Sequence, residues 1–148
     1  MLCLKIKTAA FASAVFVLLC ASTMLHAQNI IGLRFHDAVL QLGPEYEKVV
    51  DGPVTKLKYS LQIVDHPGFG VFKEYNQYDF IDGKCEARHT YMPKSHKQDF
   101  VDYFNKKFGK HDNLWRGDNC TYIAIRERDD VFELMVWPPV YEDMLDNR

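Results

Sequence analysis

The side chains of this chain that could carry out chemistry are few and unsuitably spaced. Cys85 and His89 fall on the same face of an expected strand, and a cysteine beside a histidine is a pair that nucleophilic catalysis uses. Four residues along a strand span about 13 Å, however, which is far beyond hydrogen-bond reach. No two histidines have a metal-ligand spacing such as His-Glu-x-x-His. The sequence therefore predicts no catalytic residue and no metal site.

Cofactor-binding motifs are equally scarce. The glycine-rich stretch Pro67-Gly68-Phe69-Gly70 joins two expected strands, whereas a phosphate-binding loop leads into a helix N-terminus. There is no strained-turn serine motif of the hydrolase kind. We therefore expect no cofactor and predict that the protein is not an enzyme.

Residues 1–27 are typical of an export signal. Lys5 and Lys7 precede an apolar run from Ala9 to Leu19, and small and polar residues follow it. The apolar run is too short to be a membrane span. The sequence therefore predicts a mature protein that begins at Gln28, has no transmembrane segment and is periplasmic or extracellular.

Lipid anchoring at Cys20 is the alternative way for the signal to end. Bacterial lipoprotein signals require a small residue just before the cysteine, and Val17-Leu18-Leu19 stands there instead.

Removal of residues 1–27 leaves 16 of the 18 basic residues against 20 acidic ones, so the net charge moves from −2 to −4. Such a chain has no basic field for nucleic acid, which we exclude as a partner.

Two cysteines, Cys85 and Cys120, remain after the signal. In an oxidising compartment two such cysteines most often pair. A Cys85–Cys120 disulfide would constrain the unfolded chain by roughly 3–4 kcal/mol on the chain-entropy model. We predict this disulfide as a brace between the two halves of the domain, and two separate buried thiols are the alternative.

Two amphipathic helices are predicted. The first covers about residues 37–42 and ends at Gly43. The second opens with a capping box, in which the side chains of Ser95 and Gln98 satisfy each other's free backbone donors. Its apolar face repeats every four residues and ends before Gly109; it consists of Phe100, Phe104 and Phe108.

The rest of the chain is typical of antiparallel strands. Alternation from Lys56 to Ile63 predicts one half-buried strand. Val71 to Ile81 follows as a long aromatic strand whose irregular pattern indicates a bulge. Asp82-Gly83 is a hairpin signal that leads into Lys84 to Met92, with Cys85, Ala87, His89 and Tyr91 on one face. Shorter strands are expected at Tyr46–Val50, Asn113–Trp115, Cys120–Arg128 and Val131–Trp137.

Both halves of the chain run from a helix through a glycine and a short strand to longer antiparallel strands, with Gly43 and Gly109 in matching places. This order predicts an α+β fold, a single antiparallel sheet with two helices packed on one face, built from a tandem helix-then-strands repeat. The expected ranges are a signal at 1–27, one domain at 28–140 with half-repeats at about 33–93 and 94–138, and a frayed tail at 141–148.

The stretch from Asp37 to Tyr46, DAVLQLGPEY, resembles the helix-then-Leu-Gly-x-Pro stretch of two kinds of small exported protein. These are the outer-membrane assembly lipoproteins of the SmpA/OmlA type (BamE) and the related fold of the beta-lactamase inhibitor protein. Phe108-Gly109-Lys110, followed by Trp115, is similar to a second copy. Pro44 follows its glycine directly instead of one residue later. The resemblance implies an exported module that binds another protein, and it carries over no binding residue.

Aromatic residues are the one functional class in surplus. Those concentrated in one half of the chain are Tyr59, Phe69, Phe72, Tyr75, Tyr78, Phe80 and Tyr91. Such side chains suit contact with protein or carbohydrate, although a thin domain also needs large residues to fill its core. Phe69 stands between two glycines at an expected hairpin tip. Its ring is either exposed there or buried under the loop. We expect Phe69, Tyr75 and Tyr78 to form a contact surface on the open face of the sheet.

The sequence thus predicts a secreted or periplasmic binding module whose partner is another envelope or extracellular protein. One alternative is a small-ligand carrier with a pocket between sheet and helix, which requires a closed apolar cavity. Another is a small envelope enzyme, which requires a free thiol or a converging acid and base. The oligomeric state is left open.

Overall fold

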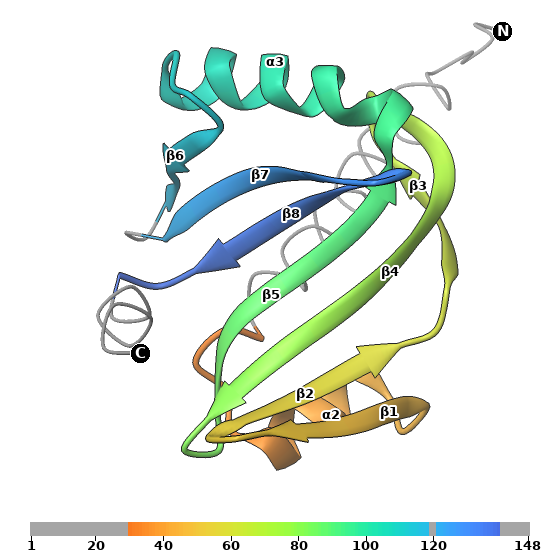
Figure 1. Ribbon diagram of the computed structural model, residues 1–148, viewed down its shortest axis with the longest axis vertical. Helices are drawn as coiled ribbons and strands as arrows, with labels where there is room; N and C mark the ends of the chain where they lie inside the picture. Colours follow the sequence, from red (N-terminus) through yellow and green to blue (C-terminus); the bar gives the residue numbers. More distant parts are fainter. Residues whose placement is uncertain (1–29, 119–120, 140–148) are drawn as a thin grey trace, which may run out of the picture. The chain divides into compact units, whose positions relative to one another are not determined.

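The structure is a computed structural model that describes residues 30–118 and 121–139 (Figure 1). The signal predicted at 1–27 and the tail predicted at 141–148 lie outside the described residues. All the elements described belong to one compact unit that begins at Ile31. In chain order they are α2 (Phe35–Leu42), β1 (Tyr46–Asp51), β2 (Val54–Tyr59), β3 (Gln62–His66), β4 (Gly70–Ile81), β5 (Lys84–Pro93), the 3-10 turn η1 (Lys94–His96), α3 (Lys97–Phe108), β6 (Leu114–Arg116), β7 (Tyr122–Arg128) and β8 (Val131–Trp137).

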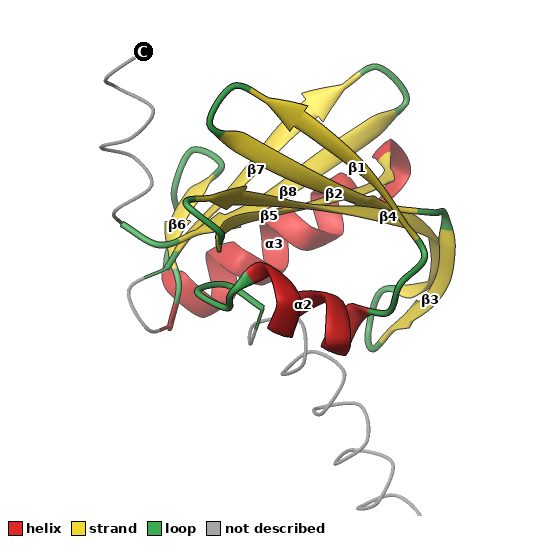
Figure 2. Cartoon of the chain, turned by 90° about the horizontal axis from the view of Figure 1, so that it is seen from below, coloured by secondary structure: helices red, strands yellow, loops and turns green. Residues whose placement is uncertain are grey.

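The described strands form one antiparallel sheet, in the order β1-β2-β4-β5-β8-β7-β6, with β3 beside the first part of β4. Both helices lie on the same side of this sheet (Figure 2). This arrangement confirms the α+β fold class predicted from the sequence. We call the two sides the helix-covered face, which carries Phe72 and Tyr78, and the helix-free face, which carries Tyr75, His89 and Met135.

The two halves of the domain share one order of elements. α2 leads into the edge strand β1 and then β2 and β4, while α3 leads into the opposite edge strand β6 and then β7 and β8. Each helix ends at a glycine with a φ of +94°, at Gly43 and Gly109. Residues that carry a side chain rarely adopt this φ, so glycine at both positions lets the chain turn from helix into strand. A common origin of the halves stays a prediction.

The larger core lies between α3 and the helix-covered face. Its buried members are Phe72, Met92, Phe100, Phe104, Trp115, Ile123, Ile125 and Phe132. Phe100 and Phe104 come from the predicted apolar face of α3, and Phe108 packs beside them. A second apolar cluster lies on the helix-free face, where the sheet curves over itself (Figure 2). Its members are Val54, Ile81, Ala87, Ala124, Met135 and Trp137.

The predicted capping box at Ser95 is wrong. Ser95 lies in η1, and the helix N-cap is His96, whose side chain makes no capping hydrogen bond. The amide of Gln98 instead donates to Asp102 Oδ1 at 2.9 Å, one turn further along the helix. The 3-10 turn displaces the helix start by one residue, so Ser95 no longer stands at the N-cap, where its hydroxyl could accept from the first turn.

The prediction of a single strand from Lys56 to Ile63 is also wrong, because residues 60 and 61 interrupt the strand and separate β2 from β3. β2 pairs with the last part of β4 and β3 with its first part, so both follow the same edge of one long strand. β4 twists strongly along its length (Figure 1), and a straight strand could not stay paired with both of its ends. The break leaves Leu61 and Ile63 exposed instead of half-buried.

A bulge between β4 and β5 corrects the predicted face of β5. Asp79 lies opposite Ala87, but Phe80 lies opposite Cys85, so Glu86 is an extra residue. The extra residue returns Cys85 to the helix-covered face, while Ala87 and the two alternate residues after it stay on the helix-free face. The sequence predicts a bulge in Val71–Ile81; the register does shift between Asp79 and Phe80 of that strand, but the extra residue lies in β5.

The predicted Cys85–Cys120 disulfide is not seen in the structure. Cys85 is a free thiol that is fully buried, and its Sγ donates to the Ala87 carbonyl oxygen at 3.7 Å. Cys120 lies outside the described residues.

Two buried tryptophans differ in one hydrogen bond, which gives a test of the core. Trp115 Nε1 donates to Asn105 Oδ1 at 3.0 Å, whereas the buried Nε1 of Trp137 has no acceptor among residues 30–118 and 121–139. An unmet buried donor costs about 1–3 kcal/mol. We therefore expect Trp115→Phe to lower the free energy of unfolding by about 1–2 kcal/mol more than Trp137→Phe, measured by urea unfolding. Equal losses would contradict this expectation.

Candidate functional site

The structure separates the three aromatic residues that were expected to share an open face. Tyr78 lies on the helix-covered face, 3% exposed, with its ring edge-on to Tyr59. Phe69 is half-buried at the β3–β4 turn, where its ring stacks on Phe100 of α3 with centroids 4.2 Å apart. Tyr75 lies on the helix-free face and is 37% exposed. Residues three apart on a strand point to opposite faces, so Tyr75 and Tyr78 cannot form one surface.

Tyr75 belongs to a pair of stacked rings on the helix-free face. Its neighbour is Tyr91 on β5, directly opposite, with ring centroids 4.4 Å apart and planes within 8°. The hydroxyl of Tyr91 donates to Glu133 Oε1 at 3.4 Å. Tyr91 is therefore held from two sides, and it supports the more exposed ring of Tyr75.

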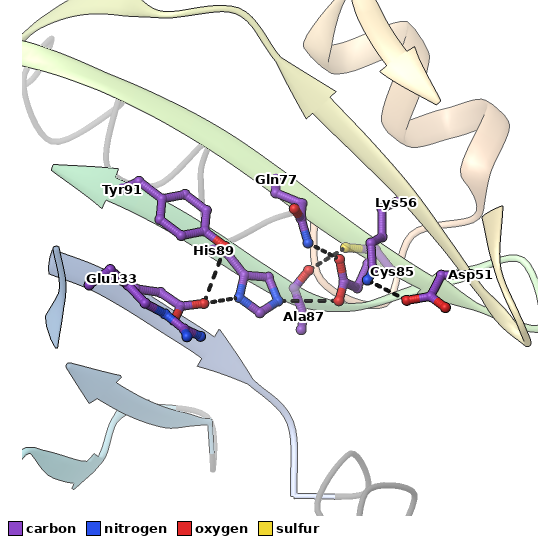
Figure 3. Close-up of polar contacts among 10 residues, drawn as sticks. Asp51, Lys56, Gln77, Cys85, Ala87, His89, Tyr91 and Glu133 are labelled. Atoms are coloured by element: carbon purple, nitrogen blue, oxygen red, sulfur yellow. Dashed lines mark hydrogen bonds and ion pairs between the residues drawn. The ribbon is translucent and has the colours of Figure 1, made fainter. Parts of the chain in front are cut away.

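Beside this pair lies a set of charges, the His89 cluster, formed by the buried residues Asp79, His89 and Glu133 and by Arg128, whose side chain is 55% exposed. His89 Nδ1 and Glu133 Oε1 are 2.7 Å apart, and His89 Nε2 lies 3.3 Å from Asp79 Oδ2 (Figure 3). Arg128 donates from Nε and Nη2 to Glu133 Oε2, at 3.1 and 2.9 Å. The four residues come from four neighbouring strands, β4, β5, β8 and β7, so the sheet register positions them.

The charges in the His89 cluster fix its protonation. Burial alone would lower the pKa of His89, but the bonded carboxylates of Asp79 and Glu133 outweigh it and raise the pKa to about 9. Burial alone would raise the pKa of Glu133, but His89 and Arg128 outweigh it and lower the pKa to about 2. At neutral pH the histidine is therefore a cation between two carboxylates.

This protonation decides what the cluster can do chemically. A general base needs a neutral imidazole nitrogen that can accept a proton at the working pH. His89 is already protonated there, and each of its ring nitrogens faces a carboxylate. The cluster thus forms an ionic layer at the helix-free face, in which His89 lies between two carboxylates and the Arg128 side chain reaches solvent.

A second polar cluster lies on the helix-covered face. His66 Nε2 and Glu74 Oε2 are 2.7 Å apart, and Asn76 Nδ2 donates to Glu74 Oε1 at 2.9 Å. Asn76 Oδ1 in turn accepts from Thr90 Oγ1 at 2.7 Å and from Arg88 Nη2 at 3.1 Å. Burial would raise the pKa of Glu74, but the bonds from His66 and Asn76 outweigh it and lower the pKa. These groups satisfy one another, as buried polar groups must.

Exposed apolar side chains gather at the β3–β4 end of the helix-free face. Ile63 lies opposite Lys73, and Val71 and Tyr75 flank Lys73 on β4, so the three apolar residues share one side of the sheet. Ile63 is 72% exposed and Val71 nearly as much. We call Ile63, Val71 and Tyr75 the apolar patch.

Two surface grooves bear on the small-ligand alternative. The first lies along the start of β1 and the end of β2 and is lined by Glu45, Tyr46, Glu47, Lys58, Tyr59 and Ser60. The second lies between the β3–β4 turn and α3 and is lined by Pro67, Gly68, Phe69, Asp99, Asp102, Tyr103 and Lys106. Both grooves are open to solvent and rimmed by charged side chains, and neither is a closed apolar cavity between sheet and helix.

The His89 cluster is not predicted by the sequence, because its members are far apart in the chain. His89 and Glu133 are 44 residues apart and meet only through the pairing of β5 with β8. One signal was available, since Glu133 stands among apolar residues in the strand Val131–Trp137. A charged residue in an otherwise apolar strand indicates a buried partner.

Within residues 30–118 and 121–139, no group of His, Cys, Asp and Glu side chains is arranged to hold a metal ion. In the same part of the chain, no helix is long and apolar enough to cross a membrane.

The thiol of Cys85 gives a direct test of the described site chemistry. Burial, together with the carboxylates of Asp79 and Glu86, raises the pKa of this thiol to about 12, so thiolate is scarce at neutral pH. We expect iodoacetamide to leave Cys85 unmodified in the folded protein and to alkylate it in urea, as located by mass spectrometry of peptides. A residue 85 that resists alkylation in urea until reductant is added would instead reveal a disulfide.

Comparison with known proteins gives no relative for this chain: no protein-family model, no curated protein and no solved structure matches it.

Proposed function

We propose that this protein is an exported, non-catalytic binding module that contacts another envelope or extracellular protein through the β3–β4–β5 part of its helix-free face. The observation that carries this proposal is the apolar patch. Three apolar side chains stand exposed there around Lys73, while His89, Arg128 and Glu133 beside Tyr75 are paired with one another. Contiguous exposed apolar residues mark interaction surfaces, because their burial against a partner releases water.

The rigidity of the surface supports the same function. Tyr91 is stacked on Tyr75 and bonded to Glu133, so the two rings form a platform whose position is set before any partner arrives. A preorganised contact loses less side-chain entropy on binding. Tyrosine also suits the rim of a protein interface, because its ring is apolar and its hydroxyl stays wet.

Export and family resemblance enter this proposal as predictions from the sequence. The signal expected at residues 1–27 predicts that the module is exported, and the resemblance to SmpA/OmlA-type and beta-lactamase inhibitor proteins implies protein binding. Similar sheets carry many functions, so the resemblance adds weight only by analogy. The surface described above is what makes the proposal specific.

The proposal is tested by photo-crosslinking in cells that express the chain. A photoreactive phenylalanine analogue replaces Tyr75 in one variant and Leu40, which is exposed on α2, in the matched control. We expect discrete adducts from position 75, weakened severalfold when Val71→Lys is added, and none from position 40. Absence of adducts at position 75, or equal adducts at both positions, contradicts the proposal.

A further inference from the structure

The edge strand β3 combines a free backbone edge with exposed apolar side chains. It pairs with β4 on one side, and no other described strand pairs with its outer edge. In an antiparallel pair only every other residue bonds to the neighbour, so the remaining N–H and C=O groups of β3 point outward. Another extended chain is the natural partner for such a row of groups.

The other edges of the described sheet are better protected than β3. β1 exposes the charged residues Glu47 and Lys48, and β6 is only 3 residues long. Charged side chains and short length are the usual ways in which proteins prevent pairing at an edge. β3 has 5 residues, Gln62 to His66, with no lysine or proline among them and the exposed Ile63 near its centre.

We propose that an extended segment of the partner protein pairs with the outer edge of β3 and extends the sheet by one strand. This inference rests on the proposed function and names the way in which the partner binds. The added strand would also bring its own side chains beside the apolar patch, so backbone and side-chain contacts would form together.

The side chains of β3 indicate which residues the added strand carries. Ile63 and Asp65 lie opposite Lys73 and Val71 and therefore share the helix-free side. Asp65 is exposed and has no ion-pair partner among the described residues. Directly opposite residues on paired strands contact each other. The segment that fits has an apolar residue opposite Ile63 and a basic residue, two positions along, opposite Asp65.

A second copy of this chain fits the edge less well than a basic segment of another protein. An antiparallel pair of β3 strands can be centred on Ile63, on Val64 or on Asp65. In these registers Asp65 lies opposite Leu61, opposite Ile63 or opposite another Asp65. Each register leaves the carboxylate facing an apolar side chain or a like charge, and none supplies a cation.

The test uses two synthetic octapeptides as probes, one with the repeat Thr-Val-Thr-Lys and the other with glutamate in place of lysine. Isotope-labelled protein is titrated with each, and backbone amide shifts and hydrogen exchange are followed by NMR. We expect the lysine peptide to slow exchange of the outward amides of residues 62–66 about tenfold at ten times its Kd, and the glutamate peptide to have no effect.

Three variants make the test specific. Ile63→Lys should abolish the response, and Asp65→Lys should reverse the preference, so that the glutamate peptide protects β3. Val50→Lys is the matched control, because Val50 is 67% exposed on the edge strand β1, and it should leave the response unchanged.

Each other outcome overturns the inference. Shifts around Tyr75 without protection of β3 amides would show a side-chain contact and no strand addition, and the proposed function would stand. No response to either peptide, with crosslinks still formed at position 75, would have the same meaning. Protection of β3 that rises with protein concentration in the absence of peptide would identify a second copy as the occupant.

Discussion

Replacing Glu133 by leucine should lower the free energy of unfolding by about 3–5 kcal/mol at pH 7. Glu133 is 2% exposed and accepts hydrogen bonds from His89 and Arg128, so its loss leaves His89 as a buried cation with the carboxylate of Asp79 alone. Removing one member of a buried charge pair costs far more than removing an exposed one. Urea unfolding of Glu133→Leu and of the unsubstituted protein measures the difference.

Glu127 provides the matched control on the neighbouring strand. It forms ion pairs with Lys94 and Lys97, but its side chain is half exposed, so Glu127→Leu should change stability little. The double variant His89→Leu with Glu133→Leu should lose less stability than Glu133→Leu alone, because the buried cation goes with its partner. If Glu133→Leu proves no more harmful than Glu127→Leu, the His89 cluster does not hold the sheet together.

Raising the pH from 6.5 through 9 should remove about 3 kcal/mol of stability. The pKa of His89 is about 9 in the folded protein and 6.5 in an unfolded chain. The folded state therefore binds the proton more tightly, and this contribution is complete below pH 6.5 and disappears as the pH rises through 9. Urea unfolding at steps between pH 6 and pH 9.5 measures it.

A His89→Gln variant should give a flat profile up to about pH 8.5, at a lower stability near pH 6. Above that pH both proteins should share a smaller loss, because the Cys85 thiol ionises only in the unfolded chain. A variant profile as steep as the original one would assign the dependence to another group. On the acid side the sign is opposite, because the pKa of Glu133 is lowered from 4.5 to about 2. Its contribution is complete above pH 4.5 and is lost as the pH falls towards 2.

Elements with strong local signals could be predicted from the sequence. The strand Val131–Trp137 has the bounds expected from its apolar run, and Asp82 and Gly83 both adopt the positive φ that the hairpin signal requires. Both signals depend only on neighbouring residues. The break before β3 could not be found in this way, because the alternation continues through residues 60 and 61 while the twist of β4 separates the strands.

The candidate site was less predictable than the fold, for two different reasons. The opposite orientation of Tyr75 and Tyr78 follows from their odd spacing on one strand and was available from the sequence. The contact between His89 and Glu133 depends on the pairing register of β5 with β8, which a local sequence pattern does not specify. Likewise, the side on which Cys85 lies depends on the extra residue Glu86, whose position in the bulge is set by the pairing.

The His89 cluster also couples the two halves during unfolding. Asp79 and His89 belong to the first half of the domain, whereas Arg128 and Glu133 belong to the second. If the halves separated, the boundary between β5 and β8 would open, and Glu133 and His89 would each lose their closest partner at once. The free energy of a species with only one half folded would thus be raised by the opened sheet edge and also by the unpaired buried charges. We therefore expect the domain to unfold as one cooperative unit, although its element order repeats.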